Sequence, residues 1–339
     1  MIRNTPVTLK FLAEKLKMSV STVSKALNDY PTINAYTKKR VQEMARELHF
    51  TPNKSAINLQ ERKSRIIGII LPNLLDHFFT RSIYGVEQFA TANGYNVIIK
   101  QTHDELEKEI QAADMLLKSR VDGLIIAISK NTQDFAHLGQ FENLGIPVVY
   151  YARNPSFNLS CHKVLGNTFQ GCYEASRFLI QRKHRQIAYL GGPKMISFTH
   201  DRFNGYIHAL RDHDIPFNAD LVAYTDFDQQ STIAAIQQLF SNTDYLPTAL
   251  VAFKESVLFD AIKYLRAVNY AHLRNMEFIG FGNHAFISYL DIPPVASVEE
   301  QPEDVGENAV KLLLQLMNKE IDHSEYQKIM VDCRLVVYE

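Results

Sequence analysis

Short runs of aliphatic and β-branched residues alternate with amphipathic helical patterns from Ile66 to the end of the chain. Runs such as IIGIILP, NVIIKQ and DGLIIAI are separated by stretches with helical periodicity, and a second, similar series begins at KVLGN. Strands that alternate with helices in this way form a parallel sheet with helices on both faces. The pattern predicts an α/β domain over residues 66–339 with two similar halves, each a parallel sheet flanked by helices.

The first part of the chain has a different pattern. Apolar residues at helical spacing mark three short helices, and only a tight turn separates the first two. Two short helices joined by such a turn form a helix-turn-helix. The third helix closes a small core around Leu12, Val23 and Leu48. We therefore expect a separate three-helix domain over residues 1–52.

Charge also separates the two parts of the chain. Residues 1–65 hold 13 Lys and Arg against 5 Asp and Glu, a net charge of +8, whereas the other 274 residues hold 23 against 32, a net charge of −9. A basic domain on an acidic body is typical of a protein whose small domain binds nucleic acid. Charge alone leaves open the alternative of a solvated charged face.

Secreted and membrane proteins are not indicated. Cys161, Cys172 and Cys333 show no C-x-x-C spacing, so they provide neither a disulfide framework nor a zinc cage and fit a reducing compartment. The N-terminus lacks the apolar core of a signal peptide, and no run of about 18 apolar residues occurs. We expect a cytoplasmic protein without a membrane segment, metal or cofactor.

No sequence motif for catalysis is present. The segment GFGNHA, residues 280–285, has the spacing of a dinucleotide-binding turn, but Asp291, Pro293 and Pro294 interrupt the helix that such a turn requires. The twelve histidines show no metal-ligand spacing. We interpret His184 as structural and do not expect an enzyme.

Residues 7–29, VTLKFLAEKLKMSVSTVSKALND, resemble the N-terminal signature of the LacI/GalR family of bacterial transcription regulators. The matching positions are Val7, Thr8, Leu9, Ala13, Ser19, Thr22, Val23, Ser24, Lys25, Leu27 and Asn28. Phe11, Leu16 and Lys17 depart from the usual acidic residue, Ala and Gly. TKKRVQEMARELHFTPN, VDGLII, HRQIAYLGGP and RFNGY extend the resemblance over nearly the whole chain. It implies an effector-controlled DNA-binding regulator, expected to be a repressor, with a two-lobed periplasmic-binding-protein-like domain.

In a helix-turn-helix the second helix enters the major groove of DNA. The expected base contacts are Val20, Ser21, Thr22 and Lys25. Lysine can donate to guanine, serine can pair with several bases, and a valine methyl can pack on thymine. The expected phosphate contacts are Lys10, Lys38, Lys39 and Arg40. The resemblance adds Thr8, Ser19, Ser24, Asn28, Asn34 and Thr37. A small helical protein-interaction domain is the alternative.

Residues 53–65 are expected to form a hinge helix and a linker. KSAINLQ aligns with the hinge helix of the family, which in relatives folds only on the operator. The resemblance assigns to Leu59 the role of a wedge in the minor groove and counts Ala56 among the DNA contacts. A seven-residue helix is marginal in water, so two copies and DNA would be needed to hold it. An exposed linker leucine without a role is the alternative.

The resemblance places an effector in the cleft between the lobes, beyond the carboxyl ends of the strands. The expected effector-binding residues are Asp76, Phe78, Arg153, Arg202, Lys254 and Asn283. Phe78 has a core aromatic as its alternative role. Ala152, Gly166 and Gly282 stand where relatives often have carboxylates that hold sugar hydroxyls.

The remaining cleft residues favour an acidic effector. Three cations with few acids would attract an anion, because guanidinium pairs well with carboxylate or phosphate. We therefore expect a uronic acid or a phosphorylated sugar. An outward-pointing Lys254, or a cleft that has lost small-molecule control, is the alternative.

The resemblance also implies a homodimer on a pseudo-palindromic operator in double-stranded DNA. The expected interface elements are the helix in residues 107–120 and the helix that begins near Phe79. One lobe is expected from about 66–165 and 297–324, and the other from about 166–296 and 325–339. A stand-alone solute-binding protein is the rival from another class, but it would need an export signal.

Overall fold

The computed structural model describes residues 7–48, 50, 63–154, 159–241 and 246–338. The chain divides into two compact units, Met1–Ser64 and Arg65–Glu339. Each unit has its own hydrophobic core and is described by itself below.

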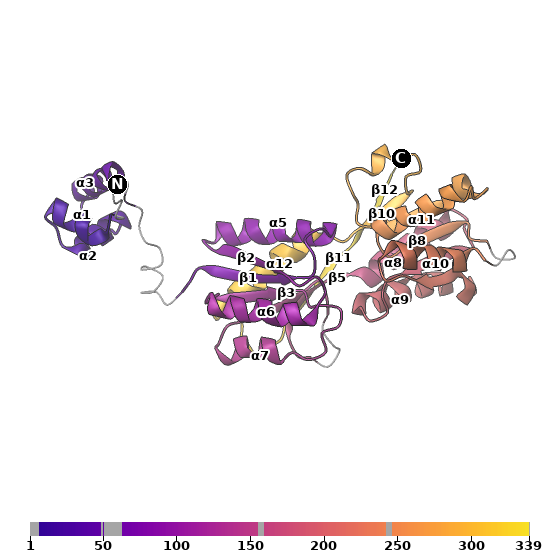
Figure 1. Ribbon diagram of the computed structural model, residues 1–339, viewed down its shortest axis with the longest axis horizontal. Coiled ribbons are helices and arrows are strands. Elements are labelled where there is room, and N and C mark those ends of the chain that lie inside the picture. Colours follow the sequence, from indigo (N-terminus) through magenta and orange to yellow (C-terminus); the bar gives the residue numbers. More distant parts are fainter. Residues whose placement is uncertain (1–6, 49, 51–62, 155–158, 242–245, 339) are drawn as a thin grey trace. The chain divides into compact units, whose positions relative to one another are not determined.

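The described part of the N-terminal unit is a bundle of helices (Figure 1). These are α1 (Leu9–Leu16), α2 (Val20–Leu27) and α3 (Ala35–Glu47). Their core contains Leu12 and Val23, both fully buried, with Leu48 packed against it. This arrangement is the predicted helix-turn-helix with a third helix closing the core.

Polar side chains start the three helices of this unit. Thr8, Ser19 and Asn34 each accept a hydrogen bond from the backbone N–H three residues later, at 3.2, 3.0 and 2.8 Å. Such caps satisfy N–H groups that have no partner within the helix. Lys17 ends α1 in the left-handed conformation at φ 55°, where a residue with a Cβ costs about 1 kcal/mol.

The first lobe of the second unit contains a sheet with strand order β11-β5-β4-β3-β1-β2, and all neighbouring strands are parallel. The strands are β1 (Ile66–Leu71), β2 (Asn96–Gln101), β3 (Gly123–Ile126), β4 (Val148–Tyr151), β5 (His162–Asn167) and β11 (Lys328–Asp332). The helices are α5 (His77–Ala92), α6 (Leu106–Lys118), α7 (Ala136–Asn143) and α12 (Pro302–Met317). Val86 of α5 and Ala309 of α12 belong to one core cluster of this sheet, and Leu116 of α6 and Phe141 of α7 belong to another.

The second lobe repeats this plan with strand order β12-β10-β9-β8-β6-β7, in which β12 is antiparallel to β10. The strands are β6 (Ile187–Gly191), β7 (Val222–Tyr224), β8 (Ala249–Ala252), β9 (Glu277–Phe281), β10 (Ala296–Glu299) and β12 (Arg334–Val337). The helices are α8 (Thr168–Gln181), α9 (Ser197–Arg211), α10 (Gln229–Leu239) and α11 (Glu255–Ala267), with 3-10 turns η1 (Ala219–Leu221), η3 (Leu273–Asn275) and η4 (Ile287–Tyr289). Helices flank both sheets, so the predicted fold class is confirmed.

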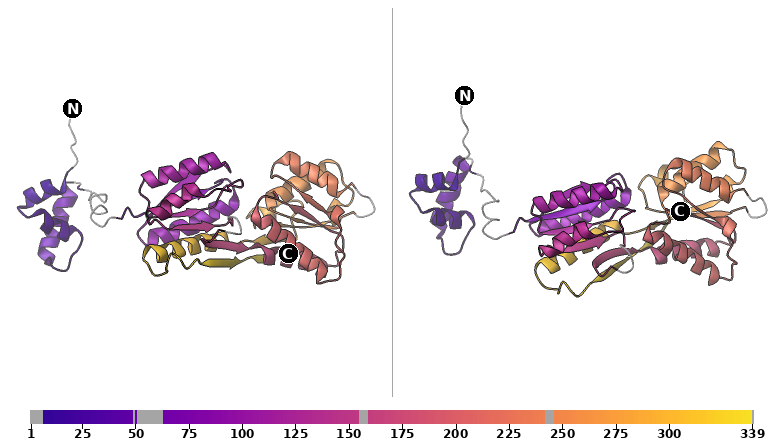
Figure 2. Two further views of the ribbon diagram at one scale, coloured as in Figure 1. Left: turned by 90° about the horizontal axis from the view of Figure 1, so that it is seen from below. Right: turned by 60° about the horizontal axis from the view of Figure 1, so that its bottom comes forward.

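Three connections join the lobes within the described residues: after β5, after β10, and between β11 and β12. Figure 2 shows the joining strands on one side of the two lobes. The expected lobe boundaries need correction here. β11 pairs with β5, so residues 328–332 belong to the first lobe, while β10 pairs with β9 in the second lobe. Only Cys333 separates β11 from β12, and two short apolar runs do not reveal which sheet each will join.

Helix α9 begins at Ser197, directly after the apolar residue Ile196. No side chain caps its first turn, because the N-cap residue is Ile196. The sequence signal that usually marks a helix start is therefore missing at this position.

Glycines let helices α5 and α12 pack very closely. A Cβ at Gly85 would lie 2.2 Å from the carbonyl oxygen of Glu303, and one at Gly306 would lie 2.0 Å from the carbonyl oxygen of Ser82. Such distances are far shorter than a van der Waals contact, so only glycine fits at either position.

Candidate functional site

Helix α2 presents one face to solvent and packs the other into the core. Val20, Ser21 and Lys25 are exposed, whereas Val23 and Ala26 are buried. The helix therefore offers side chains of the types that contact base edges, on the side opposite its packing face.

Several other expected DNA contacts have partners inside the unit. The hydroxyl groups of Ser19 and Thr22 lie 2.8 Å apart and share a hydrogen bond. Lys38 Nζ donates to the carbonyl oxygen of Asp29 at 3.0 Å and lies 2.7 Å from its carboxylate. Lys10 and Lys39, in contrast, are exposed. Lys38 thus ties α3 to the turn after α2, and its charge is partly compensated.

Further expected contacts lie on helix ends or outside the described residues. Asn34 caps α3 and accepts from the backbone of Thr37, and Asn28 ends α2. Ser24 is half-buried. Ala56 and Leu59, the expected hinge contacts, lie outside the described residues.

Sequence reasoning missed two exposed tyrosines in the N-terminal unit. Tyr30 follows α2 and Tyr36 lies in the first turn of α3, with 53% and 76% of their surface exposed. Their position in the polar segment NDYPTINAY was the only available signal. A phenolic hydroxyl can donate to a phosphate oxygen, so both belong with the candidate backbone contacts.

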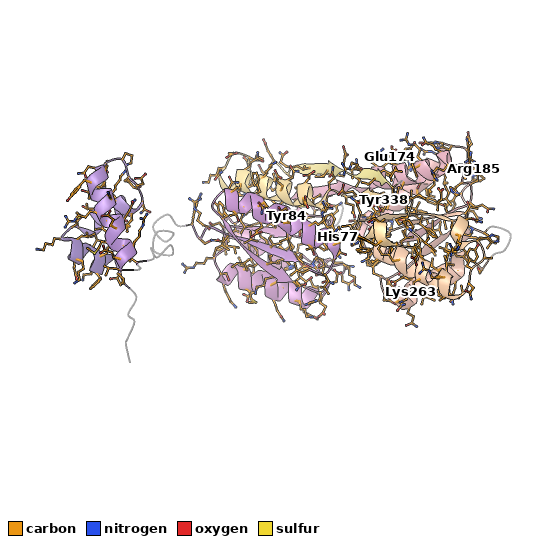
Figure 3. The ribbon with its side chains drawn as sticks, turned by 90° about the horizontal axis from the view of Figure 1, so that it is seen from above. His77, Tyr84, Glu174, Arg185, Lys263 and Tyr338 are labelled. Carbon is orange, nitrogen blue, oxygen red and sulfur yellow. The ribbon has the colours of Figure 1, made fainter. Side chains whose placement is uncertain are left out.

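The second unit contains a cavity of about 530 Å³ that both lobes line. Its walls come from the start of α5, the segment after β4, strands β5 and β11, and the starts of α9 and α11. Most of these segments follow the carboxyl ends of parallel strands, where α/β folds bind ligands. Figure 3 shows His77, at the start of α5, on the end of the first lobe that faces the second.

Most of the expected effector residues line this cavity. They are Asp76, Phe78, Arg153, Arg202 and Lys254. Phe78 is also packed against the core of the first lobe. Asn283 is a correction, because it does not line the cavity although Gly282 and His284 do. Its Oδ1 accepts a hydrogen bond from the Tyr338 hydroxyl at 2.7 Å. The side chain of Asn283 therefore has a structural role.

The three expected cations all have carboxylate partners. The guanidinium of Arg153 donates two hydrogen bonds to Asp104 and a third to the carbonyl oxygen of Ile128 at 2.9 Å. Burial opposes ionisation of Asp104, but the hydrogen bond and charge of Arg153 outweigh it and lower the pKa of that carboxyl. Lys254 Nζ lies 3.7 Å from Asp76 Oδ2.

Arg202 is almost fully buried among aromatic rings. Its guanidinium carbon lies 4.2 and 3.8 Å from the ring centroids of Phe253 and Phe281, within cation–π range. It also donates to the carbonyl oxygen of Phe253 and to the carboxylate of Glu300. Burial raises the pKa of Glu300, and the charge of Arg202 opposes that rise.

Phenylalanine is the main apolar component of the cavity wall. The residues are Phe78, Phe79, Phe198, Phe227, Phe253 and Phe281. Phe198 stacks on Phe253 with ring centroids 5.3 Å apart. Sequence reasoning found Phe78 alone, because the other rings come from different elements that only the fold brings together.

The premise that the cleft has few acids is also corrected, because Asp76, Asp201, Glu255 and Glu300 all line it. Glu255 is fully buried at the cavity, and its carboxylate accepts the backbone N–H groups of Asn283 and His284, both at 2.9 Å. A Cβ at Gly282 would lie 3.0 Å from Glu255 Oε2. A carboxylate from α11 therefore lies beside Gly282, the position on the loop after β9 where relatives often have a carboxylate.

Two histidines meet across the cleft. His77 of the first lobe and His284 of the second have ring centroids 4.1 Å apart. Burial lowers the pKa of His77, and the charges of His284 and Arg81 lower it further, against weaker opposing effects of Glu255 and Asp76. Neutral imidazoles can pack at this distance, whereas two imidazolium rings would repel each other.

Comparison with known proteins places the chain in a family. Residues 8–53 match the family described as "Bacterial regulatory proteins, lacI family", and residues 64–337 match "Periplasmic binding proteins and sugar binding domain of LacI family". The chain belongs to the LacI family. It is a DNA-binding transcriptional regulator with a small-molecule-binding domain, as the sequence resemblance predicted.

Individual relatives support the same assignment. The chain is 27% identical to the transcriptional repressor CytR of Escherichia coli K12 over 99% of this chain and 96% of the relative. It is also 27% identical to the repressor PurR of Actinobacillus pleuropneumoniae, over 94% of this chain and 93% of the relative. The lac repressor dimer bound to operator and an anti-inducer has a similar structure, with a TM-score of 0.82, 23% identity and 98% of both chains covered.

The described residues contain no group of three or more His, Cys, Asp or Glu side chains that could hold a metal ion. Within the same described part of the chain, none of the helices has the length and apolar character needed to span a bilayer. His184 Nδ1 shares a hydrogen bond with Thr248 Oγ1 at 2.9 Å, consistent with the structural role we predicted.

Proposed function

We propose that this chain is a repressor that binds a pseudo-palindromic operator as a homodimer and responds to an effector held between its lobes. The observation that carries the proposal is the exposed face of α2, with Val20, Ser21 and Lys25, in a helix-turn-helix unit separate from a two-lobed unit with a cavity. A regulator needs both parts: one to read DNA and one to sense a small molecule.

Base contacts are proposed for Val20, Ser21, Thr22 and Lys25. The exposed Lys10, Lys39 and Arg40 would bind phosphates and set the position of the unit on DNA. The remaining predicted DNA contacts are proposed to assist from the same unit: Thr8, Ser19, Ser24, Asn28, Asn34, Thr37 and Lys38. Of these, Thr8, Ser19 and Asn34 also cap the three helices.

Lys25→Ala tests whether α2 reads bases. Selection of duplexes from a random pool by the full-length protein should yield a preferred operator. Lys25→Ala should then weaken operator binding by about 1–3 kcal/mol and relax the preference at one base pair, whereas Lys10→Ala should weaken binding to all sequences alike. Equilibrium binding to operator and random duplexes at several salt concentrations measures both effects. Equal losses on both duplexes for Lys25→Ala would argue against base contact.

Leu59→Ala tests the proposed hinge. By resemblance, Leu59 inserts into the minor groove at the centre of the operator and kinks the DNA. The variant should keep nonspecific binding and lose most of the bend, which gel mobility of circularly permuted operator fragments detects. An unchanged bend angle with Leu59→Ala would exclude the wedge.

Exposed apolar side chains support the proposed homodimer. Tyr84 on α5 and Ile110 and Met115 on α6 have 56%, 43% and 49% of their surface exposed. Both helices contact the edge strand β2, and large exposed apolar residues are typical of protein contact surfaces. Analytical ultracentrifugation of the full chain would test the oligomeric state.

The cavity supports a polar, sugar-sized effector. Phenylalanine rings can cover the apolar face of such a molecule, and the surrounding carboxylates, amides and cations can bind its polar groups. Arg153 and Arg202 each keep a buried Nε–H that lacks a hydrogen-bond partner among the described residues. An effector oxygen could satisfy such a donor.

An acidic effector, such as a uronic acid or a phosphorylated sugar, remains our proposal on different grounds. Arg153, Arg202 and Lys254 do not support it, because each has a carboxylate beside it. The described lining residues include five Lys and Arg and four Asp and Glu, so the cavity has no large excess of either charge. Support for an acidic effector must therefore come from cations of the cavity wall that have no carboxylate partner.

A further inference from the structure

We propose that Lys163 and Lys328 form an anion subsite in the cleft that takes a carboxylate or phosphate group of the effector. The inference rests on the proposed function of the cleft as the effector site. It names the chemical group that one part of the cleft recognises.

The two lysines start side by side on neighbouring strands. β5 and β11 pair in parallel with Lys163 directly opposite Lys328. Adjacent strands lie about 4.8 Å apart, and directly opposite residues project from the same face of the sheet. Leu165 and Met330, the pair two residues further along, line the cavity together with both lysines. This face of the strands that join the lobes therefore forms one wall of the cleft.

Neither lysine has the carboxylate partner that the other cavity cations have. Lys163 Nζ donates to Asn154 Oδ1, a neutral amide oxygen, at 3.1 Å. Within the described residues no carboxylate oxygen lies within 4 Å of the ammonium nitrogen of Lys163 or Lys328, whereas Arg153 and Arg202 each have one. The segment PSFN, residues 155–158, which follows Asn154 in the chain, contains no acidic residue.

Asp201 is an acidic side chain whose carboxyl is affected by the charge of Lys328. It lies on α9 in the second lobe and also lines the cavity. Burial raises the pKa of Asp201, and the charge of Lys328 only partly offsets that rise. Within the described part of the chain, Asp201 forms no ion pair within 4 Å with either lysine.

A bound anion would reduce the repulsion between the ammonium groups of Lys163 and Lys328. Like charges directly opposite each other destabilise a sheet. An oxyanion between the two ammonium groups would accept charge-assisted hydrogen bonds from both, since each ammonium has three donors. The apolar Leu165 and Met330 beside the lysines provide a surface for the uncharged part of the same ligand.

Competitive labelling of the full-length protein tests the subsite. A short pulse of acetic anhydride would be followed by peptide mass spectrometry, with inorganic phosphate, glucose 6-phosphate, glucuronate or glucose as the probe and sodium chloride holding the ionic strength constant. Acetylation of Lys163 and Lys328 should slow by about tenfold with at least one anionic probe and remain unchanged with glucose. Slowing by the phosphates alone would assign a phosphate group, and slowing by glucuronate alone a carboxylate.

Lys263 provides the internal control, because it is exposed on α11 and does not line the cavity. Unchanged labelling of Lys163 and Lys328 with every probe would overturn the proposal. So would slowing that Lys263 shares, since that would be a general salt effect.

Substitutions distinguish a failure of the anion subsite from a failure of the proposed regulator function. The double variant Lys163→Gln, Lys328→Gln should lose calorimetrically detected binding of the protecting anion by about tenfold or more, while Lys263→Gln should retain it. Without effector, the double variant should bind the selected operator like the unmodified protein, because neither lysine is in the N-terminal unit. If the labelling test fails while operator binding persists, only the subsite is rejected. Failure of the unmodified protein to prefer any duplex would reject the proposed function instead.

Discussion

At the scale of single residues, His77 and His284 place two titratable rings in contact between the lobes, with centroids 4.1 Å apart. The groups that influence His77 come from both lobes: Arg81 and Asp76 from the first, His284 and Glu255 from the second. Because its pKa is lowered in the folded protein, the unfolded chain binds the proton more readily near pH 6.5. The stabilising contribution of neutral His77 is therefore fully present above that pH and is lost as the pH falls towards the folded pKa.

His77→Phe should weaken this pH dependence, because phenylalanine keeps a flat ring at the contact and cannot take up a proton. The unmodified protein should lose more free energy of unfolding than the variant between about pH 7.5 and about pH 5.5. Urea unfolding at both pH values measures the difference. The control is His272→Phe, which replaces an exposed histidine. Equal losses in the unmodified protein and His77→Phe would contradict the prediction.

At the scale of elements, the close packing of α5 on α12 holds the first lobe together. The glycines at 85 and 306 allow the backbone of each helix to touch the other, and a Cβ at Gly85 would clash with backbone rather than with a movable side chain. The helices would have to separate to accept a larger residue, and a well-packed core resists such a shift.

Gly85→Ala should destabilise the second unit by about 1–3 kcal/mol or more, because overpacking forces backbone movement. Gly139 in α7 is a matched control, since it is also helical and a Cβ there would meet no atom within 4 Å. Gly139→Ala should be neutral or stabilise by about 0.5–1 kcal/mol through helix propensity. Denaturant unfolding followed by circular dichroism compares the two. Similar changes for both variants would disprove the role given to Gly85.

At the scale of the whole molecule, the two units have separate cores. The N-terminal core contains Leu12, Val23 and Val41, and none of these residues appears in the core clusters of the second unit. Units that share no core residues can unfold in separate transitions, so the chain need not behave as one cooperative block.

Leu12→Ala should lower the stability of the N-terminal unit by about 2–5 kcal/mol and leave the second unit unchanged, because the cavity it creates lies in only one core. Leu250→Ala, in the core of the second lobe, should lower the stability of the second unit and leave the N-terminal unit unchanged. Differential scanning calorimetry of the full chain should show two transitions, each shifted by one variant. A single transition that both variants shift equally would show that the units unfold together.

Local patterns in the sequence determined the element types, the helix-turn-helix and the family. Caps such as Thr8 and Ser19 act within three residues, and helical and strand periodicities are likewise short-range. For this reason the exposed face of α2 and the alternation in the second unit could be read from the chain. Five of the six expected cavity residues line the cavity, but they came from the resemblance to the family.

Tertiary structure alone decided which groups meet. Arg202 pairs with Glu300 and Arg153 with Asp104, 98 and 49 residues apart, and Lys163 lies opposite Lys328, which follows it by more than 160 residues. The sequence of β11 likewise did not show which of the two sheets this strand joins. Strand register and helix packing over long chain separations set these neighbours, and short-range periodicity carries no information about them. The charge balance of the cleft therefore had to come from the fold.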